Sequence, residues 1–410
     1  MSDISAYILY ASLFSALYFQ IFLLVTFFEG KEKVQKKKTE DELPTVTMVV
    51  PCFNESRTLR ATVESLLALD YPERKLGIFI VDDGSSDNTY EIARSLAKEF
   101  PTRVVAHTKA NGGKHTALNL AIETVSSDFI GCLDADSFVN PDALKKMISY
   151  FDDPKVMAVT PAMHVHSPTN ILQMMQKAEY NLGIFTKRVF GMLDAIHVTP
   201  GPFSIFRHSV FEHIGVFKKA HSTEDMEIAF RIQAHGYKIA NCHTAKVFTV
   251  TPNTIKKLYR QRTRWVYGFI NNAIDYRFIF FRKKYGNMGM FTLPFAVIGA
   301  VFALYLTANI IYDITKIVVN NIDRWTTVGI TFHMPHWDLF FLNVESLTFI
   351  AIALVGLTAV IVFMGKKVAE GSVKPSKDIL YFFLFYGFLA PIWLSKAVYN
   401  TIFAKNTPWR

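Results

Sequence analysis

The sequence predicts an α/β domain with a mostly parallel sheet, inserted between transmembrane α-helices. Three observations support this fold class. Residues 46–133 alternate short β-rich runs with helical stretches, which is typical of doubly wound sheets. Four apolar segments outside this region are each long enough, or nearly so, to cross about 30 Å of hydrocarbon as a helix. Acidic and glycine-containing motifs follow the expected strands, at the edge where open α/β sheets bind ligands.

The four apolar segments are expected to be membrane spans. A single one could be a buried core helix, but four segments that each end in polar or charged sequence favour spans. The chain has 36 phenylalanines among 410 residues, which is high for a soluble protein. The first segment has no basic leader and is too long for a signal peptide, so we expect a retained anchor. The spans are predicted at residues 4–28, 287–312, 339–365 and 379–403.

Lysine and arginine residues predict the orientation of these spans. The linker at 29–45 and the segment between the third and fourth spans each carry a cluster of lysines, whereas the loop expected at 313–338 has only Lys316 and Arg324. We therefore expect residues 29–285 to be cytoplasmic and both termini to be external. The net charge of +9 fits apposition to a lipid bilayer. No basic recognition helix or zinc-ligand spacing is present, which argues against a nucleic-acid partner.

The cytoplasmic domain is expected at residues 46–250. Its three cysteines show no CxxC spacing, so free buried thiols in a reducing compartment are the plain interpretation. These cysteines are Cys52, Cys132 and Cys242. The expected strands are 46–50, 77–81, 103–107 and 129–133, and the helices between them are 57–69, 90–100 and 114–125.

Two carboxylates directly follow the last of these strands, in Asp134-Ala135-Asp136. Burying two unpaired charges within a strand is costly, so the pair is expected where the strand ends at the carboxyl edge of the sheet. Carboxylates are hard oxygen donors, and Mg²⁺ or Mn²⁺ is usually held by one or two of them together with substrate phosphates. An ordinary surface turn is the alternative for this motif alone.

Two further motifs follow earlier strands. The carboxylates of Asp82-Asp83-Gly84 could accept hydrogen bonds from a base or ribose, or could belong to a turn with a helix cap. In Asn111-Gly112-Gly113-Lys114, glycines let backbone N–H groups approach a phosphate, and Lys114 lies at a helix N-terminus. Neither the Walker A spacing nor a GxGxxG fingerprint after a strand is present, which disfavours a nicotinamide or flavin enzyme.

An acidic helix start occurs at Ser222-Thr223-Glu224-Asp225. The helix is expected to run to about His235 and to end at Gly236, with Ser222 or Thr223 as its cap. Glu224 and Asp225 could simply complement the helix dipole. Alternatively one of them is a general base, because a carboxylate near a helix N-terminus tends to stay ionised.

The segment at 251–286 is expected to form amphipathic helices at the membrane interface. Within it, Gln261, Arg264 and Trp265 are spaced i, i+3, i+4 and share one helix face. A guanidinium beside an indole and an amide could grip a diphosphate and stack on a sugar. The alternative is a helix lying on anionic lipid, and both can hold because the other faces remain available for lipid.

Taken in order, these motifs resemble those of the processive, membrane-embedded family 2 glycosyltransferases, which include cellulose, chitin, hyaluronan and poly-N-acetylglucosamine synthases. The Thr-Glu-Asp and Gln-Arg-x-Arg-Trp forms look most like those of poly-N-acetylglucosamine and cellulose synthases. Only one span precedes the domain, where several relatives have two or more. The resemblance covers about residues 46–268, and its motifs are Asp82-Asp83-Gly84, Asn111-Gly112-Gly113-Lys114, Asp134-Ala135-Asp136, Thr223-Glu224-Asp225 and Gln261-Arg262-Thr263-Arg264-Trp265.

The resemblance implies a GT-A-type nucleotide-sugar-binding domain with a role for each matching residue. Asp225 would be the catalytic base. Asp136, with Asp134, would bind Mg²⁺ or Mn²⁺. The acceptor would lie against Trp265, Gly201 and Glu224. The residues implied at the UDP-sugar are Glu55, Asp82, Asp83, Lys114, Asp134, Asp136, Gln261, Arg264 and Trp265.

The implied activity is inverting, metal-dependent transfer from a UDP-sugar to the hydroxyl of a growing β-linked polysaccharide, processive and coupled to export. Such a protein would be a multi-pass plasma membrane protein whose partners are the UDP-sugar, the glycan acceptor, the bilayer and accessory export or modification proteins. One alternative is non-processive transfer of a sugar to a polyprenyl phosphate or other lipid. Another is a non-catalytic transporter or scaffold, against which the two intact acidic sites argue.

Overall fold

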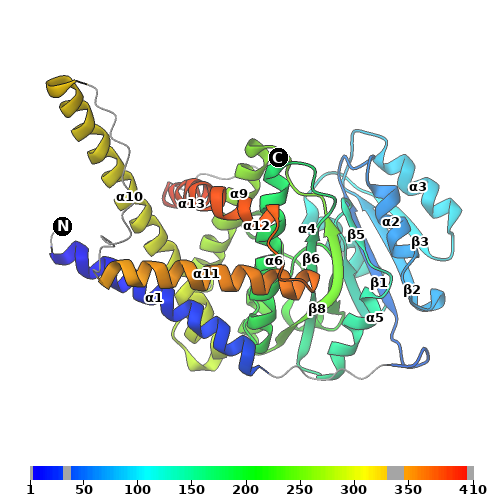
Figure 1. The fold of residues 1–410 in the computed structure, drawn as a ribbon. Helices are drawn as coiled ribbons and strands as arrows, with labels where there is room; N and C mark the ends of the chain where they lie inside the picture. The colour runs from blue at the N-terminus through cyan, green and yellow to red at the C-terminus, as the bar shows by residue number, and fades with distance from the viewer. Residues whose placement is uncertain (1–2, 31–37, 330–345, 404–410) are drawn as a thin grey trace.

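The computed structural model describes residues 3–30, 38–329 and 346–403. Figure 1 shows a domain built on a β-sheet beside a group of long helices, with the amino terminus at the far end of that group. The two parts are joined by helix α6, which runs along the sheet and also contacts the long helices. The predicted division into an α/β domain and flanking apolar helices is therefore seen in the structure.

Within the described residues the sheet has eight strands in the order β3-β2-β1-β4-β7-β6-β8-β5. β3, β2, β1 and β4 run parallel, as the alternating pattern predicts. β7 pairs antiparallel with both β4 and β6, and β5 pairs antiparallel with β8. The strands are β1 (Val46–Cys52), β2 (Leu76–Asp82), β3 (Val104–Thr108), β4 (Phe129–Cys132), β5 (Ser137–Val139), β6 (Val156–Val165), β7 (Ser204–Arg207) and β8 (Lys238–Thr249).

Within the described residues the sheet is mixed: four of its seven neighbouring pairs are parallel, as expected, and three are antiparallel. The first antiparallel pair arises from the loop before β7. The Phe203 N–H donates to the Cys132 carbonyl at 2.6 Å, so the chain enters β7 at the point where β4 ends. A strand that starts at the end of its neighbour runs antiparallel to it.

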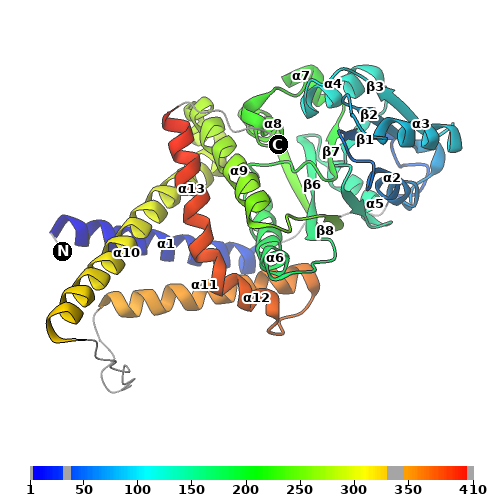
Figure 2. The same cartoon turned by 90° about the horizontal axis from the view of Figure 1, so that it is seen from above.

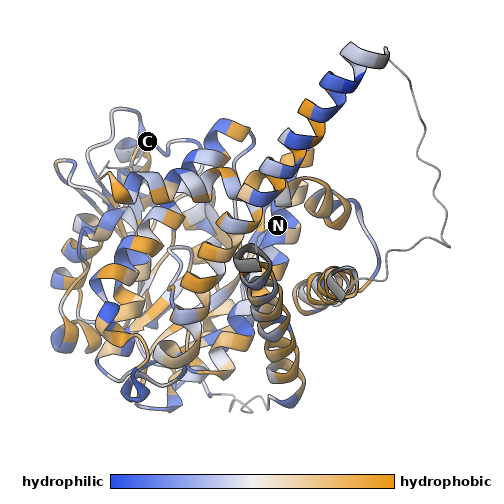
Figure 3. Ribbon diagram, turned by 90° about the vertical axis from the view of Figure 1, so that its left-hand side faces the viewer, coloured by the Kyte–Doolittle hydropathy of each residue, from blue (hydrophilic) through white to orange (hydrophobic). Residues whose placement is uncertain are grey.

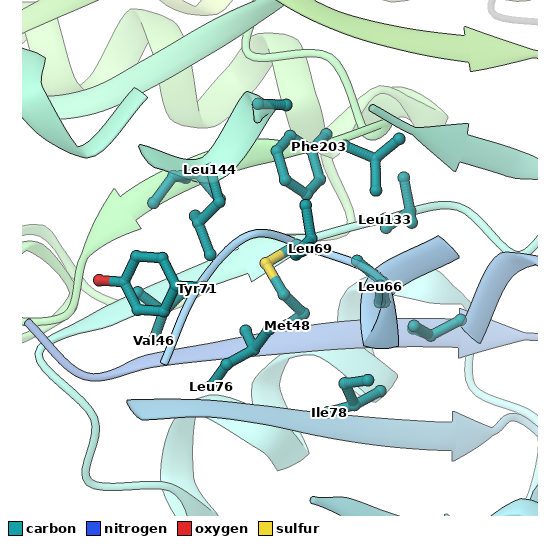
Figure 4. Close-up of a cluster of buried hydrophobic side chains, with 14 of the residues drawn as sticks. Val46, Met48, Leu66, Leu69, Tyr71, Leu76, Ile78, Leu133, Leu144 and Phe203 are labelled. Atoms are coloured by element: carbon teal, nitrogen blue, oxygen red, sulfur yellow. The ribbon is translucent and has the colours of Figure 1, made fainter. Parts of the chain in front are cut away.

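Helices cover both faces of the sheet, because alternate side chains of a strand point to opposite faces. Met48 and Ile78 lie in one core with α2, α3 and α5, and Figure 4 shows them beside Leu66 and Phe203. Neighbouring strand residues such as Val49 face α4, α7 and α8. The helices are α2 (Leu59–Leu67), α3 (Thr89–Glu99), α4 (Lys114–Thr124), α5 (Ala143–Ile148), α6 (Ile171–Met192), α7 (Val210–Ile214), α8 (Glu224–Ala234) and α9 (Ile255–Asp275).

Helix α6 packs on the sheet and on two of the long helices, α1 (Asp3–Glu29) and α11 (Ser346–Glu370). Its buried Phe185 lies in one apolar cluster with Leu24 of α1 and Ile361 of α11. In Figure 2 these helices lie on one side of α6 and the sheet lies on the other. Apolar packing of this kind fixes the position of the α/β domain against the long helices.

Among the described residues, four helices are long and apolar enough to cross a membrane: Tyr7–Glu29, Met288–Thr327, Thr348–Glu370 and Lys377–Ile402. Their positions agree with the four apolar segments of the sequence. Figure 3 colours α1 and α11 as mostly hydrophobic, whereas the far part of α10 alternates hydrophobic and hydrophilic residues. The last candidate span consists of α12 (Lys377–Tyr381), a π-helical turn (Phe382–Tyr386) and α13 (Gly387–Ile402).

Two helix boundaries differ from the prediction. α10 runs from Leu293 to Val328, so the first part of the loop expected at 313–338 is helical. α11 continues past the apolar run to Glu370, whose Oε1 pairs with Lys177 Nζ of α6 at 2.9 Å. The extension of α10 alternates polar and apolar residues and that of α11 is mainly charged, so hydropathy alone ended the predicted spans too early. The start of the expected third span, 339–345, lies outside the described residues.

Candidate active site

The parallel strands bring the acidic motifs together at one edge of the sheet. β2 ends at Asp82, β4 ends just before Asp134, and β1 leads into the turn that carries Glu55. Because parallel strands share the direction of their carboxyl ends, motifs that lie far apart in the sequence meet there. The N-termini of α4 and α8 point their first residues, Lys114 and Glu224, toward the same place: the Lys114 Nζ lies 3.9 Å from Glu224 Oε1.

Asp83 is buried, and three neighbouring groups donate to its carboxylate. Its carboxylate accepts the backbone N–H groups of Gly112 and Gly113 at 3.0 and 2.8 Å, and pairs with Lys109 Nζ at 2.6 Å. Asp82 accepts the Thr108 hydroxyl at 2.9 Å. The glycine N–H groups that the sequence suggested for a phosphate are therefore bonded to a carboxylate. They shape the loop that presents Lys114.

Lys114 lies at the centre of the site. Its ammonium pairs with Asp134, and Gly201 packs directly against this pair. A Cβ built on Gly201 would lie 2.8 Å from Asp134 Oδ2 and closer still to Lys114 Nζ. Burial lowers the pKa of Lys114, but the carboxylates of Asp134 and Glu224 more than offset this and raise it above its ordinary value. Lys114 therefore stays charged inside the site.

Asp134 and Asp136 are the two carboxylates that the sequence predicts for a divalent cation. In the part of the chain that the structure describes, no group of three or more His, Cys, Asp or Glu is placed to hold an ion. Mg²⁺ commonly takes one or two carboxylates and completes its shell with phosphate and water oxygens, so two are enough. Burial, with further contributions from Asp134 and Glu55, raises the pKa of Asp136 to about 7. A cation would relieve this crowding of carboxylates, and the residues fit a divalent metal.

Asp225 is the second residue of α8 and lines a pocket together with Lys114. Thr199 anchors it: the N–H and the hydroxyl of Thr199 donate to the Asp225 carbonyl at 3.0 and 2.8 Å. The Asp225 Oδ1 accepts a hydrogen bond from the Met226 N–H at 3.0 Å. Burial, and next the carboxylate of Glu224, raise the pKa of Asp225 to about 6, although Lys114 and Arg264 lower it. The pocket is lined in part by Lys114, Cys132, Thr199, Gly201, Glu224 and Asp225.

The start of α8 is not capped as the sequence suggested. Thr223 is the N-cap residue, but no side chain caps the helix. The Thr223 hydroxyl instead accepts a hydrogen bond from Asn272 Nδ2 of α9 at 3.0 Å. Ser222 has a positive φ of 62°, and its carbonyl accepts a hydrogen bond from an Arg264 guanidinium nitrogen at 3.3 Å. α9 therefore holds the residues that precede Glu224 and Asp225.

The Gln261–Trp265 motif lies on α9 as predicted, but its two arginines contact different parts of the protein. Arg264 donates to the Ser222 carbonyl and lowers the pKa of Asp225, so it lies near that carboxylate. Arg262, which the sequence did not single out, is buried and bonded to Glu179 of α6. Gln261 accepts a hydrogen bond from Arg262 at 2.6 Å. Helical spacing alone does not reveal this division.

Three residues of the site were missed from the sequence: Lys109, Glu179 and Tyr180. Lys109 pairs with Asp83, while Glu179 pairs with Arg262. Burial raises the pKa of Tyr180 to about 12, with Arg262 lowering it and Glu179 and Asp136 raising it, and the Arg262 guanidinium lies 6.0 Å from the centroid of its ring. All three sit in segments without a motif. The Asp83 partner of Lys109 lies 26 positions away in the sequence and the Arg262 partner of Glu179 lies 83 positions away, so local sequence patterns gave no signal for these two pairs.

Comparison with known proteins agrees with this geometry. A model of the family described as "Glycosyltransferase like family 2" matches residues 44–268. A poly-beta-1,6-N-acetyl-D-glucosamine synthase of Staphylococcus epidermidis is 29% identical over 352 residues, covering 84% of this chain and 82% of that protein. The synthase of the same name from Staphylococcus aureus (strain COL) is 31% identical over 306 residues, covering 73% of each.

A solved structure shares the fold along nearly the whole chain. It is a mannosyltransferase from Pyrobaculum calidifontis in complex with GDP-Man and Mn²⁺, with a TM-score of 0.66 and 16% identity. The alignment covers 98% of this chain and 99% of that one. The mixed sheet and the helices that flank it therefore form a GT-A-like fold. With its GT-A-like domain and its matching family model, the chain belongs to glycosyltransferase family 2.

Proposed function

We propose that this protein transfers a sugar, with inversion, from a UDP-sugar to a hydroxyl of a growing β-linked polysaccharide, and that N-acetylglucosamine is the first sugar to test. The names of its Staphylococcus relatives support the polymer and the sugar. The observation that carries the chemistry is one pocket lined both by a half-buried carboxylate, Asp225, and by Lys114, whose ammonium is paired with Asp134.

Asp225 is the base in this proposal. The acceptor oxygen forms a bond to the anomeric carbon, the bond from that carbon to the diphosphate oxygen breaks, and UDP leaves. The proton of the acceptor hydroxyl passes to Asp225. Burial raises the pKa of this carboxyl to about 6, which makes it a better proton acceptor near neutral pH than an exposed aspartate. The Thr199 and Met226 contacts fix its position.

The donor end of the pocket holds the leaving group. Asp82 and Asp83 lie at the end of β2, where they are proposed to contact the uridine, together with Glu55. Lys114 and Arg264 are the cations near the base, and each would stabilise charge that develops on the diphosphate. Both lower the pKa of Asp225, so both act on the space around its carboxylate.

Asp136, with Asp134, is proposed to hold Mg²⁺ or Mn²⁺. When bound there, the metal would neutralise charge on the diphosphate oxygens as UDP leaves. The pairing of Asp134 with Lys114 would let one carboxylate serve both the metal and the ammonium that faces the sugar. Asp136 is then the principal ligand.

The acceptor chain is proposed to lie against Trp265, Gly201 and Glu224 and to leave through the spans. Four candidate spans flank the domain, and α6 connects it to two of them. We place residues 29–285 in the cytoplasm and both termini outside, because the lysine clusters mark two segments as cytoplasmic. The proposal includes processive synthesis coupled to export, in the plasma membrane and with accessory export or modification proteins.

A product assay tests the proposal. Purified membranes are incubated with UDP-N-acetylglucosamine, UDP-glucose and UDP-glucuronic acid in parallel, and the products are separated by size and digested with linkage-specific glycosidases. We expect a ladder of long glycans from UDP-N-acetylglucosamine. A single sugar on a polyprenyl phosphate would identify the non-processive alternative, and no transfer from any donor would leave a transporter or scaffold.

The pH dependence of transfer reports the base. Asp225 must be ionised to accept a proton, so the rate should fall as pH drops through about 6 and level off above about 7. Protonation of Asp136 would also lower the rate, but excess metal competes with that proton and shifts its effect to lower pH. If the fall in rate occurs near pH 6 at both low and saturating Mn²⁺, it reports the protonation of Asp225. A fall whose midpoint moves with metal concentration would contradict this assignment.

Gly201→Ala should lower transfer by about tenfold or more, because a Cβ cannot fit without displacing the Lys114–Asp134 pair. The matched control is Gly183→Ala, since a Cβ on that glycine meets nothing within 4 Å. Initial rates at saturating donor and acceptor, measured on equal amounts of folded protein, compare the two. Equal rates for Gly201→Ala and Gly183→Ala would show that the pair tolerates the shift.

A further inference from the structure

Arg262 and Glu179 form a buried ion pair that the chemistry described above does not use. Arg262 is 3% exposed. Its Nε donates to Glu179 Oε1 at 3.0 Å and its second guanidinium nitrogen donates to Oε2 at 2.7 Å. This two-point contact fixes the plane of the guanidinium. It joins the middle of α9 to the middle of α6.

The same guanidinium touches two residues that are proposed to face the substrates. Its remaining terminal nitrogen donates to Gln261 Oε1 at 2.6 Å. Its central carbon lies 4.2 Å from the ring centroid of Trp265, within the range of a cation–π contact. One side chain therefore holds the amide of Gln261 on one side and the indole of Trp265 on the other.

Glu179 also reaches the last candidate span. The Tyr386 hydroxyl donates to Glu179 Oε1 at 3.4 Å. Tyr386 closes the π-helical turn of that span and stacks on Phe382, with ring centroids 4.7 Å apart. Further along, α13 packs on α9, and Asn271 Nδ2 donates to the Thr401 hydroxyl at 3.2 Å. In Figure 2, α13 lies alongside α9.

The electrostatics keep this contact intact. Burial lowers the pKa of Arg262, and the carboxylate of Glu179 more than offsets it, so the guanidinium stays charged. A charge that is buried with one partner loses most of its compensation when that partner is neutralised. Arg262 would then move toward water, and both Gln261 and Trp265 would lose their support.

We propose that Arg262 and Glu179 are a positioning pair, which sets the orientation of Gln261 and Trp265 and couples the acceptor end of the site to the last span. The pair does not touch the reacting atoms. The inference rests on the proposed function in one respect, which is that Trp265 binds the acceptor sugar. It adds that the Trp265 surface is held by a residue of α6 and by the span through which the product is proposed to leave.

The chain offers a matched control for this pair. Arg231 and Glu227 of α8 form a second buried ion pair at 2.8 Å, and the Tyr276 hydroxyl donates to Glu227 at 2.6 Å. The chemistry is the same: an arginine, a glutamate and a tyrosine. Arg231, however, donates to the backbone carbonyls of Ile214 and Val216, at 2.8 and 2.9 Å. The second set therefore supports a loop.

The test compares Glu179→Gln with Glu227→Gln in the full-length protein in detergent or nanodiscs. Glu179→Gln should raise the concentration of oligosaccharide acceptor that gives half-maximal rate by about ten- to a hundredfold and shorten the products. Its KM for the UDP-sugar should stay near that of the unchanged protein. Glu227→Gln should leave both constants and the product length unchanged. If Glu179→Gln fails to fold, Arg262→Lys replaces it, since lysine keeps the charge but lacks the planar fork.

A double mutant separates positioning from general damage. If Glu179 acts through Trp265, adding Glu179→Gln to Trp265→Ala should change the acceptor constant no further, whereas independent effects would multiply. Multiplying effects, wild-type constants in Glu179→Gln, or the same shift in Glu227→Gln would overturn the inference while the proposed function stands.

Trp265 fluorescence tests the positioning even if no sugar is transferred. In a protein whose other tryptophans, Trp325, Trp337, Trp393 and Trp409, are replaced by phenylalanine, Trp265 is the only indole. Glu179→Gln should increase its quenching by acrylamide about twofold or more, because the guanidinium no longer covers the ring. Quenching equal to that of the parent protein would refute the pair's role. A chain without any transferase activity would refute the proposed function alone.

Discussion

Asp225→Asn is expected to reduce sugar transfer by about 10²–10⁴-fold, the usual contribution of a positioned general base. Asparagine has the same shape and keeps the side-chain oxygen that accepts the Met226 N–H, so α8 should start unchanged. It cannot take the proton of the acceptor hydroxyl. Binding of the UDP-sugar should remain close to that of the unchanged protein, because Asp225 is assigned to the acceptor side. Radiolabelled transfer measures the first quantity and calorimetric titration the second.

Asp70→Asn is the matched control, since it makes the same chemical change at an exposed aspartate that pairs with Lys145. It should transfer sugar at the normal rate. The fall in transfer rate near pH 6 should also be absent from the residual activity of Asp225→Asn. Transfer by Asp225→Asn at the normal rate, or equal losses in both variants, would remove Asp225 from the role of base.

Asp136→Asn is expected to weaken binding of the UDP-sugar in the presence of Mn²⁺ by about 10²–10³-fold, since a metal that neutralises phosphate charge contributes several kcal/mol. Removing the metal with EDTA should reduce the unchanged protein to the same level, and EDTA should then have little further effect on the variant. The Ser137 hydroxyl that donates to Asp136 at 3.2 Å can still donate to the asparagine oxygen, so the fold should persist.

The comparison with Asp134→Asn distinguishes metal binding from the loss of a charge. That variant breaks the pair with Lys114 and should affect sugar transfer as well as metal binding. A direct readout is the electron paramagnetic resonance signal of bound Mn²⁺, which Asp136→Asn should abolish without any sugar donor being turned over. Transfer that survives EDTA, or Mn²⁺ binding unchanged in Asp136→Asn, would contradict the metal assignment.

Much of the fold could be predicted because its signals are local. The expected strands at 46–50, 77–81 and 129–133 lie within one or two residues of β1, β2 and β4. Their parallel pairing followed from the helices between them. The strand order beyond β4 did not follow, because it depends on contacts between distant residues, such as the Phe203–Cys132 hydrogen bond between residues 71 positions apart.

The candidate site, like the fold, could be predicted only in part. The motifs carrying Asp134, Asp136 and Asp225 were recognisable, and the sheet brings them to one edge. The prediction that the Gly112 and Gly113 N–H groups approach a phosphate is wrong for this structure, because both groups donate to the Asp83 carboxylate. Both interpretations were compatible with the sequence, since glycine N–H groups suit any anion.

By itself the sequence determined the strand-end motifs, the four apolar segments and the chemical character of the site, because each depends on residue type and on spacing within one element. Only the tertiary structure decided which arginine of the Gln261–Trp265 motif faces inward. Arg262 and Arg264 lie two positions apart on α9, about 200° around the helix, so they face different neighbours. Which of the two meets Glu179 depends on where α6 lies, and the packing of α6 between the sheet and the long helices sets that position.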